Sequence, residues 1–155
     1  MAATGAIGAR FILAAGNVSD ARLLSHAYRA GEKQACFHNA FALARAHPEL
    51  TYCEGLALNV FPVEHAWCLD PDGRVADNTW GQGPAAYAGV AFDTKFVIRW
   101  VAQRQRYSVL AEMFPRELLG LDPATYLANP APERLRAVEA MVAEACALMT
   151  ASPRA

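Results

Sequence analysis

The sequence predicts an α+β domain, because predicted helices flank a central block of predicted strands. Helical spacing of apolar residues marks residues 35–46, whereas residues 51–79 are rich in β-forming and aromatic side chains. A final amphipathic helix is predicted over about residues 132–150. The 155 residues are therefore expected to form a single domain, 1–155, with a helical C-terminal extension over about residues 115–155.

Composition and charge narrow the classes of partner. Hydrophobic residues make up 54% of the chain and charged residues 19%, which excludes a disordered chain. The 14 basic residues against 15 acidic ones give a net charge of −1, so the chain lacks an electrostatic footprint for nucleic acid or for an anionic membrane. The sequence also shows no basic leader and no apolar run near the roughly 18 residues of a membrane span. We expect a cytoplasmic protein that binds neither nucleic acid nor membrane, and its oligomeric state stays open.

Two elements are predicted before residue 35. The short apolar run 10–15 predicts a small strand or a packed arm. Residues 17–20 (Asn-Val-Ser-Asp) offer N-cap side chains for a helix that ends at Gly31 and carries its apolar residues at helical spacing: Leu23, Leu24, Ala27 and Tyr28. The next helix, over about residues 35–46, is ended by Pro48.

A hairpin is predicted in the middle of the chain. The turn sequence Pro71-Asp72-Gly73 separates residues 65–70 from residues 74–79, which are expected to pair as antiparallel strands. This register makes Asp77 about one diagonal neighbour of His65, at roughly 7–8 Å between backbones. An imidazole and a carboxylate that lean together can bridge that separation.

The rest of the chain predicts shorter elements. Residues 81–84 predict a loop, 107–110 a further strand and 115–120 a short helix. Asp93-Thr94 opens a predicted helix with one apolar face: Phe96, Val97, Trp100 and Val101. Tyr87 and Phe92 are candidates for lining a substrate cleft.

Three polar residues could carry chemistry together. Cys36 lies in the first turn of the predicted helix 35–46, where unpaired N–H groups and the positive end of the helix dipole favour a thiolate. His65 begins one strand of the hairpin, and Asp77 lies on the other. A thiol with a pKa of about 8.5 needs a base at neutral pH, an imidazole can take its proton, and a carboxylate can fix the tautomer of the imidazole.

Structural roles and a metal site are the alternatives. A helical cysteine is commonly a small buried apolar group, a strand histidine a hydrogen-bonded structural residue, and an aspartate near a turn a cap. A zinc site would draw on a set of thiols and imidazoles without a CxxC pair: Cys36, His38, Cys53, His65 and Cys68. Without that spacing we expect no metal, and we expect all four cysteines, Cys146 included, to be reduced thiols.

The order of these motifs resembles a known superfamily. A cysteine at a helix start, a strand that opens His65-Ala-Trp67 and a strand end Asp77-Asn-Thr-Trp80 resemble the transglutaminase-like branch of the papain-like cysteine enzymes. Its members include transglutaminases, arylamine N-acetyltransferases and related cysteine peptidases. Residues 52–55 (Tyr-Cys-Glu-Gly) resemble the strand ahead of the histidine, and the resemblance covers roughly residues 32–92. It implies a papain-like core in which the nucleophile helix packs on a small antiparallel sheet.

The resemblance implies a role for each member of the triad. Cys36 would be the nucleophile, His65 the general base and Asp77 the residue that orients it. Asn78 replaces the usual proline of this motif and is an alternative third member, because consecutive strand residues point to opposite faces and only one of the two can face His65.

Further residues are expected around the triad. The Cys36 N–H would belong to the oxyanion hole, with the Gln34 side chain as a second donor. Trp67 and Trp80 would screen the ion pair from water or serve as core residues.

The resemblance implies a cysteine-dependent acyl-transfer enzyme that forms a thioester and needs no cofactor. Its substrate would be a peptide or a small amide or ester. The lack of a calcium-site motif points away from an animal-type transglutaminase and toward a bacterial peptidase or amidase. The alternative is a catalytically inactive papain-like binding or scaffolding module, in which the helical face near the C-terminus docks a partner or packs on its own domain.

Overall fold

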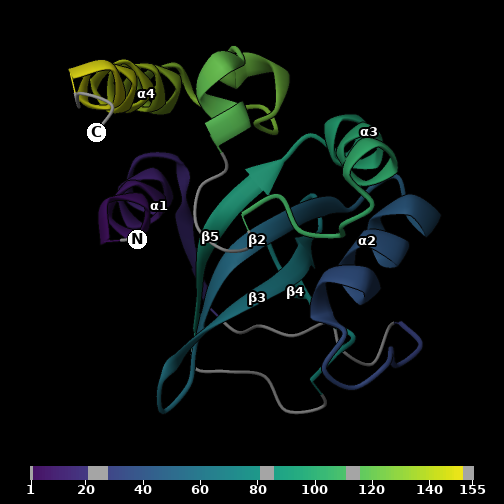
Figure 1. The fold of residues 1–155 in the computed structure, drawn as a ribbon. Coiled ribbons are helices and arrows are strands. Elements are labelled where there is room, and N and C mark those ends of the chain that lie inside the picture. Colours follow the sequence, from purple (N-terminus) through teal and green to yellow (C-terminus); the bar gives the residue numbers. More distant parts are fainter. Residues whose placement is uncertain (1, 21–27, 81–85, 111–115, 152–155) are drawn as a thin grey trace.

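The computed structural model describes residues 2–20, 28–80, 86–110 and 116–151. Within these residues the fold is α+β, as predicted, and its centre is a curled antiparallel sheet of five strands in the order β1-β5-β2-β3-β4 (Figure 1). The strands are β1 (Asn17–Asp20), β2 (Thr51–Leu58), β3 (Pro62–Leu69), β4 (Val75–Ala76) and β5 (Ala86–Phe92).

Helices cover the sheet in two pairs (Figure 1). α2 and α3 pack together beside β2 and β3, and α1 packs on α4 near β5. The helices are α1 (Ala2–Ala15), α2 (Cys36–Ala46), α3 (Thr94–Arg104) and α4 (Pro132–Ala151), with the short 3-10 helices η1 (Arg116–Gly120) and η2 (Pro123–Thr125) between α3 and α4. Among the described helices, none is both long and apolar enough to cross a membrane.

The helical C-terminal part packs on the rest of the chain. Val138, Met141 and Ala145 of α4 are buried in the large core cluster that also contains Phe11 of α1. Leu135 and Val142 pack against the same cluster. The apolar face of this helix is therefore used within the molecule, which was one of the two roles that the sequence allowed.

The predicted hairpin is present as β3 and β4. The Asp70 N–H donates to the Arg74 carbonyl at 2.9 Å, and the Gly73 N–H donates to the Asp70 carbonyl at 2.9 Å. Gly73 adopts φ +77°, a conformation that favours glycine. The Asp70 carboxylate also accepts from the N–H of Asp72 at 3.0 Å and of Arg74 at 2.8 Å. These local bonds fix the register Cys68↔Ala76.

Other predicted elements are present with small shifts. The predicted helix over 35–46 is α2, and the helix predicted to open at Asp93-Thr94 is α3, whose Phe96 N–H donates to the Asp93 side chain at 2.8 Å. The short helix predicted near 115–120 is the 3-10 helix η1. The loop predicted at 81–84 lies outside the described residues.

Three predictions for residues 10–31 differ from the structure or fall outside the described residues. Residues 10–15 belong to α1 and form no strand. This alanine-rich segment buries Phe11 against Phe92 of β5 and Tyr126 as one face of a helix. Residues 17–20, expected to supply helix caps, pair with β5 as β1. Most of the helix predicted up to Gly31 lies in 21–27, outside the described residues.

Residues 107–110 form no strand, because a buried carboxylate binds their backbone. Glu54 of β2 is 1% exposed and accepts the N–H of Val109 at 2.6 Å and of Leu110 at 2.7 Å. It also accepts the hydroxyls of Tyr52 at 2.7 Å and Ser108 at 2.8 Å. Each oxygen of the carboxylate therefore has two donors, and the segment after α3 is fastened to the sheet by a side chain rather than by strand pairing.

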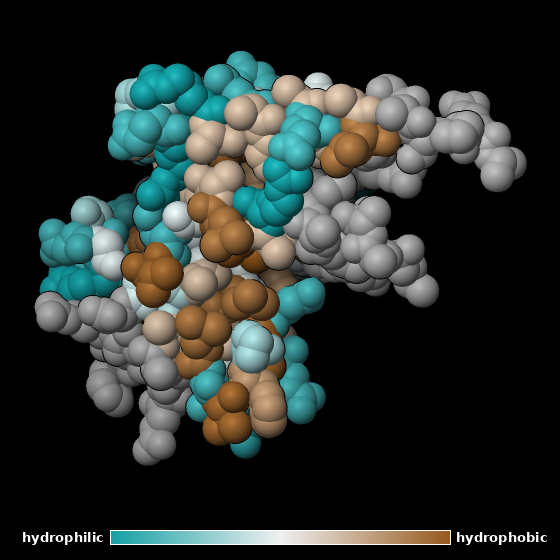
Figure 2. Space-filling view, turned by 90° about the vertical axis from the view of Figure 1, so that its left-hand side faces the viewer, coloured by the Kyte–Doolittle hydropathy of each residue, from teal (hydrophilic) through white to brown (hydrophobic). Residues whose placement is uncertain are grey.

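One side of the molecule carries exposed apolar side chains. Figure 2 shows them gathered as a stripe on the side that carries α1 and β1. The exposed large apolar residues of these elements and of the β2–β3 hairpin are Leu13, Val18, Val60, Phe61 and Val63.

Candidate active site

Cys36 is the first residue of α2 and is half-buried. No side chain caps this helix end, since Ala35 precedes it, so the N–H groups of the first turn remain available to the sulfur or to a ligand. Burial raises the pKa of the Cys36 thiol, but a hydrogen bond and the charge of His65 outweigh burial, with help from the N–H groups of Ala66 and Phe37. The net effect lowers the pKa, so this environment favours the thiolate.

His65 lies on β3 with 2% of its side chain exposed and interacts with both Asp77 and Cys36. Its Nε2 lies 2.7 Å from Asp77 Oδ2, which leaves Nδ1 as the ring nitrogen for the Cys36 side chain. Burial lowers the pKa of His65, but the hydrogen bonds and charges of Asp77 and Cys36 raise it to about 9. The imidazolium form is therefore favoured at neutral pH.

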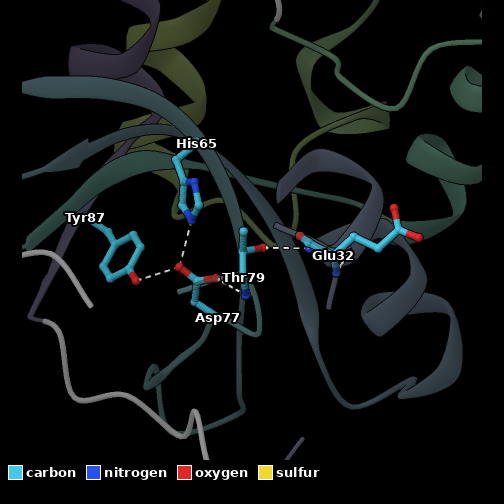
Figure 3. Close-up of polar contacts among 6 residues, drawn as sticks. Glu32, His65, Asp77, Thr79 and Tyr87 are labelled. Atoms are coloured by element: carbon cyan, nitrogen blue, oxygen red, sulfur yellow. Dashed lines mark hydrogen bonds and ion pairs between the residues drawn. The ribbon is translucent and has the colours of Figure 1, made fainter. Parts of the chain in front are cut away.

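Asp77 follows β4 directly and is buried. Continuing the β3–β4 register by one residue places it opposite Trp67 and diagonal to His65, as the hairpin predicted. Its carboxylate accepts the Tyr87 hydroxyl at 2.8 Å and the Thr79 N–H at 2.8 Å in addition to His65 (Figure 3). Burial raises the pKa of Asp77, but these donors, His65 first, lower it below its ordinary value.

Asn78 is not at the imidazole. Its side-chain amide donates to the Arg29 carbonyl at 3.3 Å, and its own carbonyl accepts the Gly31 N–H at 2.8 Å. It therefore binds the segment before α2, while the preceding residue Asp77 binds His65, because neighbouring residues of an extended chain point to opposite sides. The alternative in which Asn78 orients the histidine was wrong.

Two tryptophan rings lie parallel to the imidazole. The half-buried Trp80 ring stacks on His65 at 4.2 Å between centroids and 17° between planes. The buried Trp67 ring is 6.4 Å away at 15° and also contacts Tyr87 at 4.8 Å. Both rings keep water from the faces of the His65–Asp77 pair, and Trp67 belongs to a small core cluster as well.

Two paired glycines, Gly55 and Gly89, allow close packing at this site. Gly55 of β2 pairs with His65 on one side and with Gly89 of β5 on the other. A Cβ atom at Gly89 would lie 2.4 Å from the ring of Trp67 and 2.4 Å from the Glu54 carbonyl oxygen. The missing side chain of Gly89 on β5 thus lets the Trp67 ring lie close over the sheet.

Replacing Gly89 with alanine is expected to lower the free energy of unfolding by about 1–3 kcal/mol, because the new methyl group overlaps backbone and ring atoms that cannot both move away. Urea denaturation measures this. Gly120→Ala is the matched control, since no atom lies within 4 Å of a Cβ there. Equal urea midpoints for the two variants would contradict the packing argument.

The remaining predicted residue, Gln34, is exposed and adopts φ +63° in the turn before α2. Its role as an oxyanion donor stays a prediction. The alternative zinc set does not converge, since within the described part of the chain no three metal-ligating side chains gather. Cys68 instead donates to the Ala40 carbonyl, and the His38 ring packs on Tyr107 at 4.8 Å.

Sequence reasoning missed four contributors to this region: Asn39, Glu54, Thr79 and Tyr87. Tyr87 was expected in a substrate cleft, but it is fully buried on β5 and its hydroxyl binds Asp77. The Asp-x-Thr spacing is the one local signal that could have found Thr79, whose N–H turns back to the carboxylate two residues earlier. Comparison of the chain with protein-family models, with curated proteins and with solved structures finds no match.

Proposed function

We propose that this chain is a cysteine-dependent acyl-transfer enzyme of the transglutaminase-like, papain-like type, with Cys36, His65 and Asp77 as its catalytic triad. The observation that carries the proposal is the buried His65–Asp77 pair at 2.7 Å, with Cys36, the first residue of α2, as the other neighbour that shifts the pKa of the imidazole. A low thiol pKa beside a high imidazole pKa describes a thiolate–imidazolium pair, which is the resting state that such chemistry needs.

In the first half of the reaction the Cys36 sulfur attacks the carbonyl carbon of an amide or ester. The carbonyl electrons move to oxygen, and the N–H groups at the start of α2 stabilise that oxyanion. The oxyanion then collapses, the bond to nitrogen or oxygen breaks, and the His65 imidazolium gives its proton to the departing amine or alkoxide. The products of this half are a thioester on Cys36 and a neutral imidazole.

In the second half His65 takes a proton from water or from an amine acceptor, which attacks the thioester carbonyl. The C–S bond breaks, Cys36 leaves as a thiolate, and the resting ion pair is restored. Asp77 keeps its charge throughout and holds the imidazole by Nε2, which leaves Nδ1 to exchange the proton with the Cys36 sulfur. Peptides and small amides or esters are the substrate class we propose, and the four free thiols suit a cytoplasmic setting.

The test is the pH dependence of alkylation by iodoacetamide, followed by peptide mass mapping of all four cysteines. Cys36 is expected to react well below pH 8, because its thiolate is favoured there. Cys146 is the internal reference, since it is also half-buried. Cys53 and Cys68 are expected to stay unlabelled, because both are buried and burial raises the pKa of each thiol.

His65→Gln is the matched variant, because glutamine can still donate an N–H toward Asp77 but cannot become a cation. In this variant burial continues to raise the pKa of Cys36, and the charge of His65 no longer lowers it. The midpoint of the pH profile of Cys36 labelling should therefore move up to about pH 8.5 or above. A wild-type Cys36 that is inert, or whose profile does not respond to His65, would contradict the proposal and favour the inactive binding module.

A further inference from the structure

The side-chain amide of Asn39 joins the helix that carries Cys36 to the segment that carries Asp77. Asn39 lies on α2 one turn after Cys36 and is 4% exposed. Its Nδ2 donates to Thr79 Oγ1 at 3.0 Å and to the Glu32 carbonyl at 2.7 Å, and its Oδ1 accepts the Glu32 N–H at 3.1 Å. Both of its N–H groups and its oxygen are therefore used.

The chain of hydrogen bonds continues from Thr79 to the candidate triad. The Thr79 N–H donates to Asp77 Oδ1, and Asp77 Oδ2 binds His65 (Figure 3). The backbone N–H of Thr79 thus binds Asp77, and its hydroxyl oxygen accepts a hydrogen bond from Asn39 of α2. No other polar side-chain contact links α2 to residues 77–80 among the hydrogen bonds of the described residues.

The surroundings of the amide leave it little freedom. A Cβ atom at Gly31 would lie 2.4 Å from the Asn39 side chain, so the backbone of the segment before α2 closes over the amide. That same segment is bound to the strand end through the Gly31 N–H and the Asn78 carbonyl at 2.8 Å. A buried amide with every group paired and backbone packed against it has one orientation.

We propose that Asn39 is a positioning residue of this site, which holds the N-terminus of α2, and with it Cys36, in register with Thr79 and Asp77. The inference rests on the proposed function. Its physical basis is that proton transfer between sulfur and imidazole requires hydrogen-bond distance, whereas the two groups come from a helix and a strand that pack through side chains. A polar tie one turn from the nucleophile limits sliding of the helix along the sheet.

Thr79 offers a clean test, because its two roles can be separated. Thr79→Val removes the acceptor of the Asn39 N–H but keeps the shape and the N–H toward Asp77, whereas Thr79→Ser keeps both contacts. We expect Thr79→Val to lower the rate of Cys36 alkylation at pH 6 about fivefold. This change corresponds to an upward shift of the pH profile of alkylation by roughly 0.7 pH unit. Thr79→Ser should match the wild-type protein. A residue that only adds stability would not move the position of this profile.

Asn39→Leu provides the second variant, since leucine has a similar volume and makes no hydrogen bond. It should shift the Cys36 profile at least as far as Thr79→Val. Labelling of the buried Cys53 reports unfolding, so a variant that unfolds is recognised and the Thr79 pair then decides.

The outcomes separate this inference from the proposed function. One outcome is that wild-type Cys36 is alkylated well below pH 8 (a low-pH profile) and that this profile shifts in Thr79→Val and not in Thr79→Ser. That outcome supports the proposed function and the role of Asn39. A low-pH profile that stays in place in Thr79→Val overturns the role of Asn39 and leaves the proposed function standing. A wild-type protein without a low-pH profile overturns both.

Discussion

Replacing Cys36 with alanine is expected to lower the turnover of amide and ester substrates by about four orders of magnitude or more, because the reaction loses its nucleophile and only binding and oxyanion stabilisation remain. The melting temperature should change little. Cys36 is half-buried at the start of α2, and alanine is at least as good a helix former. The measurement is steady-state hydrolysis of p-nitrophenyl acetate and of a panel of peptide amides.

A mass measurement makes this result specific. An acyl group trapped on the Cys36 peptide during ester turnover, absent from Cys36→Ala, identifies the thioester. Cys146→Ala is the control and should keep full activity, because its thiol lies by the Leu119 carbonyl and not at His65. Turnover that survives in Cys36→Ala would mean that another group is the nucleophile and would remove the main support of the proposed function.

The geometry of the site could be predicted wherever local chemistry fixes the chain. The turn Pro71-Asp72-Gly73 sets the β3–β4 register through bonds within five residues, so the diagonal placement of Asp77 and His65 followed from sequence spacing. The start of α2 at Cys36 followed from helical periodicity in the same way. The order of the predicted helices and strands along the chain was enough to predict the α+β class.

The parts of the fold and of the site that the sequence did not predict depend on contacts between segments far apart in the chain. β5 lies between β1 and β2, yet its sequence, Ala-Tyr-Ala-Gly-Val-Ala-Phe, has one β-branched residue, so local propensity gave no strand there and Tyr87 was not placed at Asp77. Residues 10–15 are apolar enough for a strand or a helix, and packing against α4 decides for the helix. Asn39 and Thr79 are 40 positions apart, and no local pattern pairs them.

Glu54 is the residue whose replacement should cost the most stability. Glu54→Ala is expected to lower the free energy of unfolding by about 3–5 kcal/mol, because it removes a buried carboxylate that accepts four hydrogen bonds and opens a cavity beneath residues 108–110. Two of the four donors are hydroxyls, on Tyr52 and Ser108, and two are backbone N–H groups that strand pairing does not satisfy. Urea denaturation followed by circular dichroism measures the loss, which is large beside a typical total of about 5–15 kcal/mol.

Glu64→Ala on β3 is the matched control, since Glu64 is exposed and its loss should change the free energy of unfolding by about 0.5 kcal/mol or less. Glu54→Gln should fall between the two, because the amide oxygen still accepts one set of donors while the amide N–H₂ faces the other set. The free energy of unfolding should therefore increase from Glu54→Ala to Glu54→Gln to the wild-type protein, an order that follows from counting donors and acceptors alone. Equal midpoints for Glu54→Ala and Glu64→Ala would mean that residues 108–110 are held by packing, and that the carboxylate beneath them is dispensable.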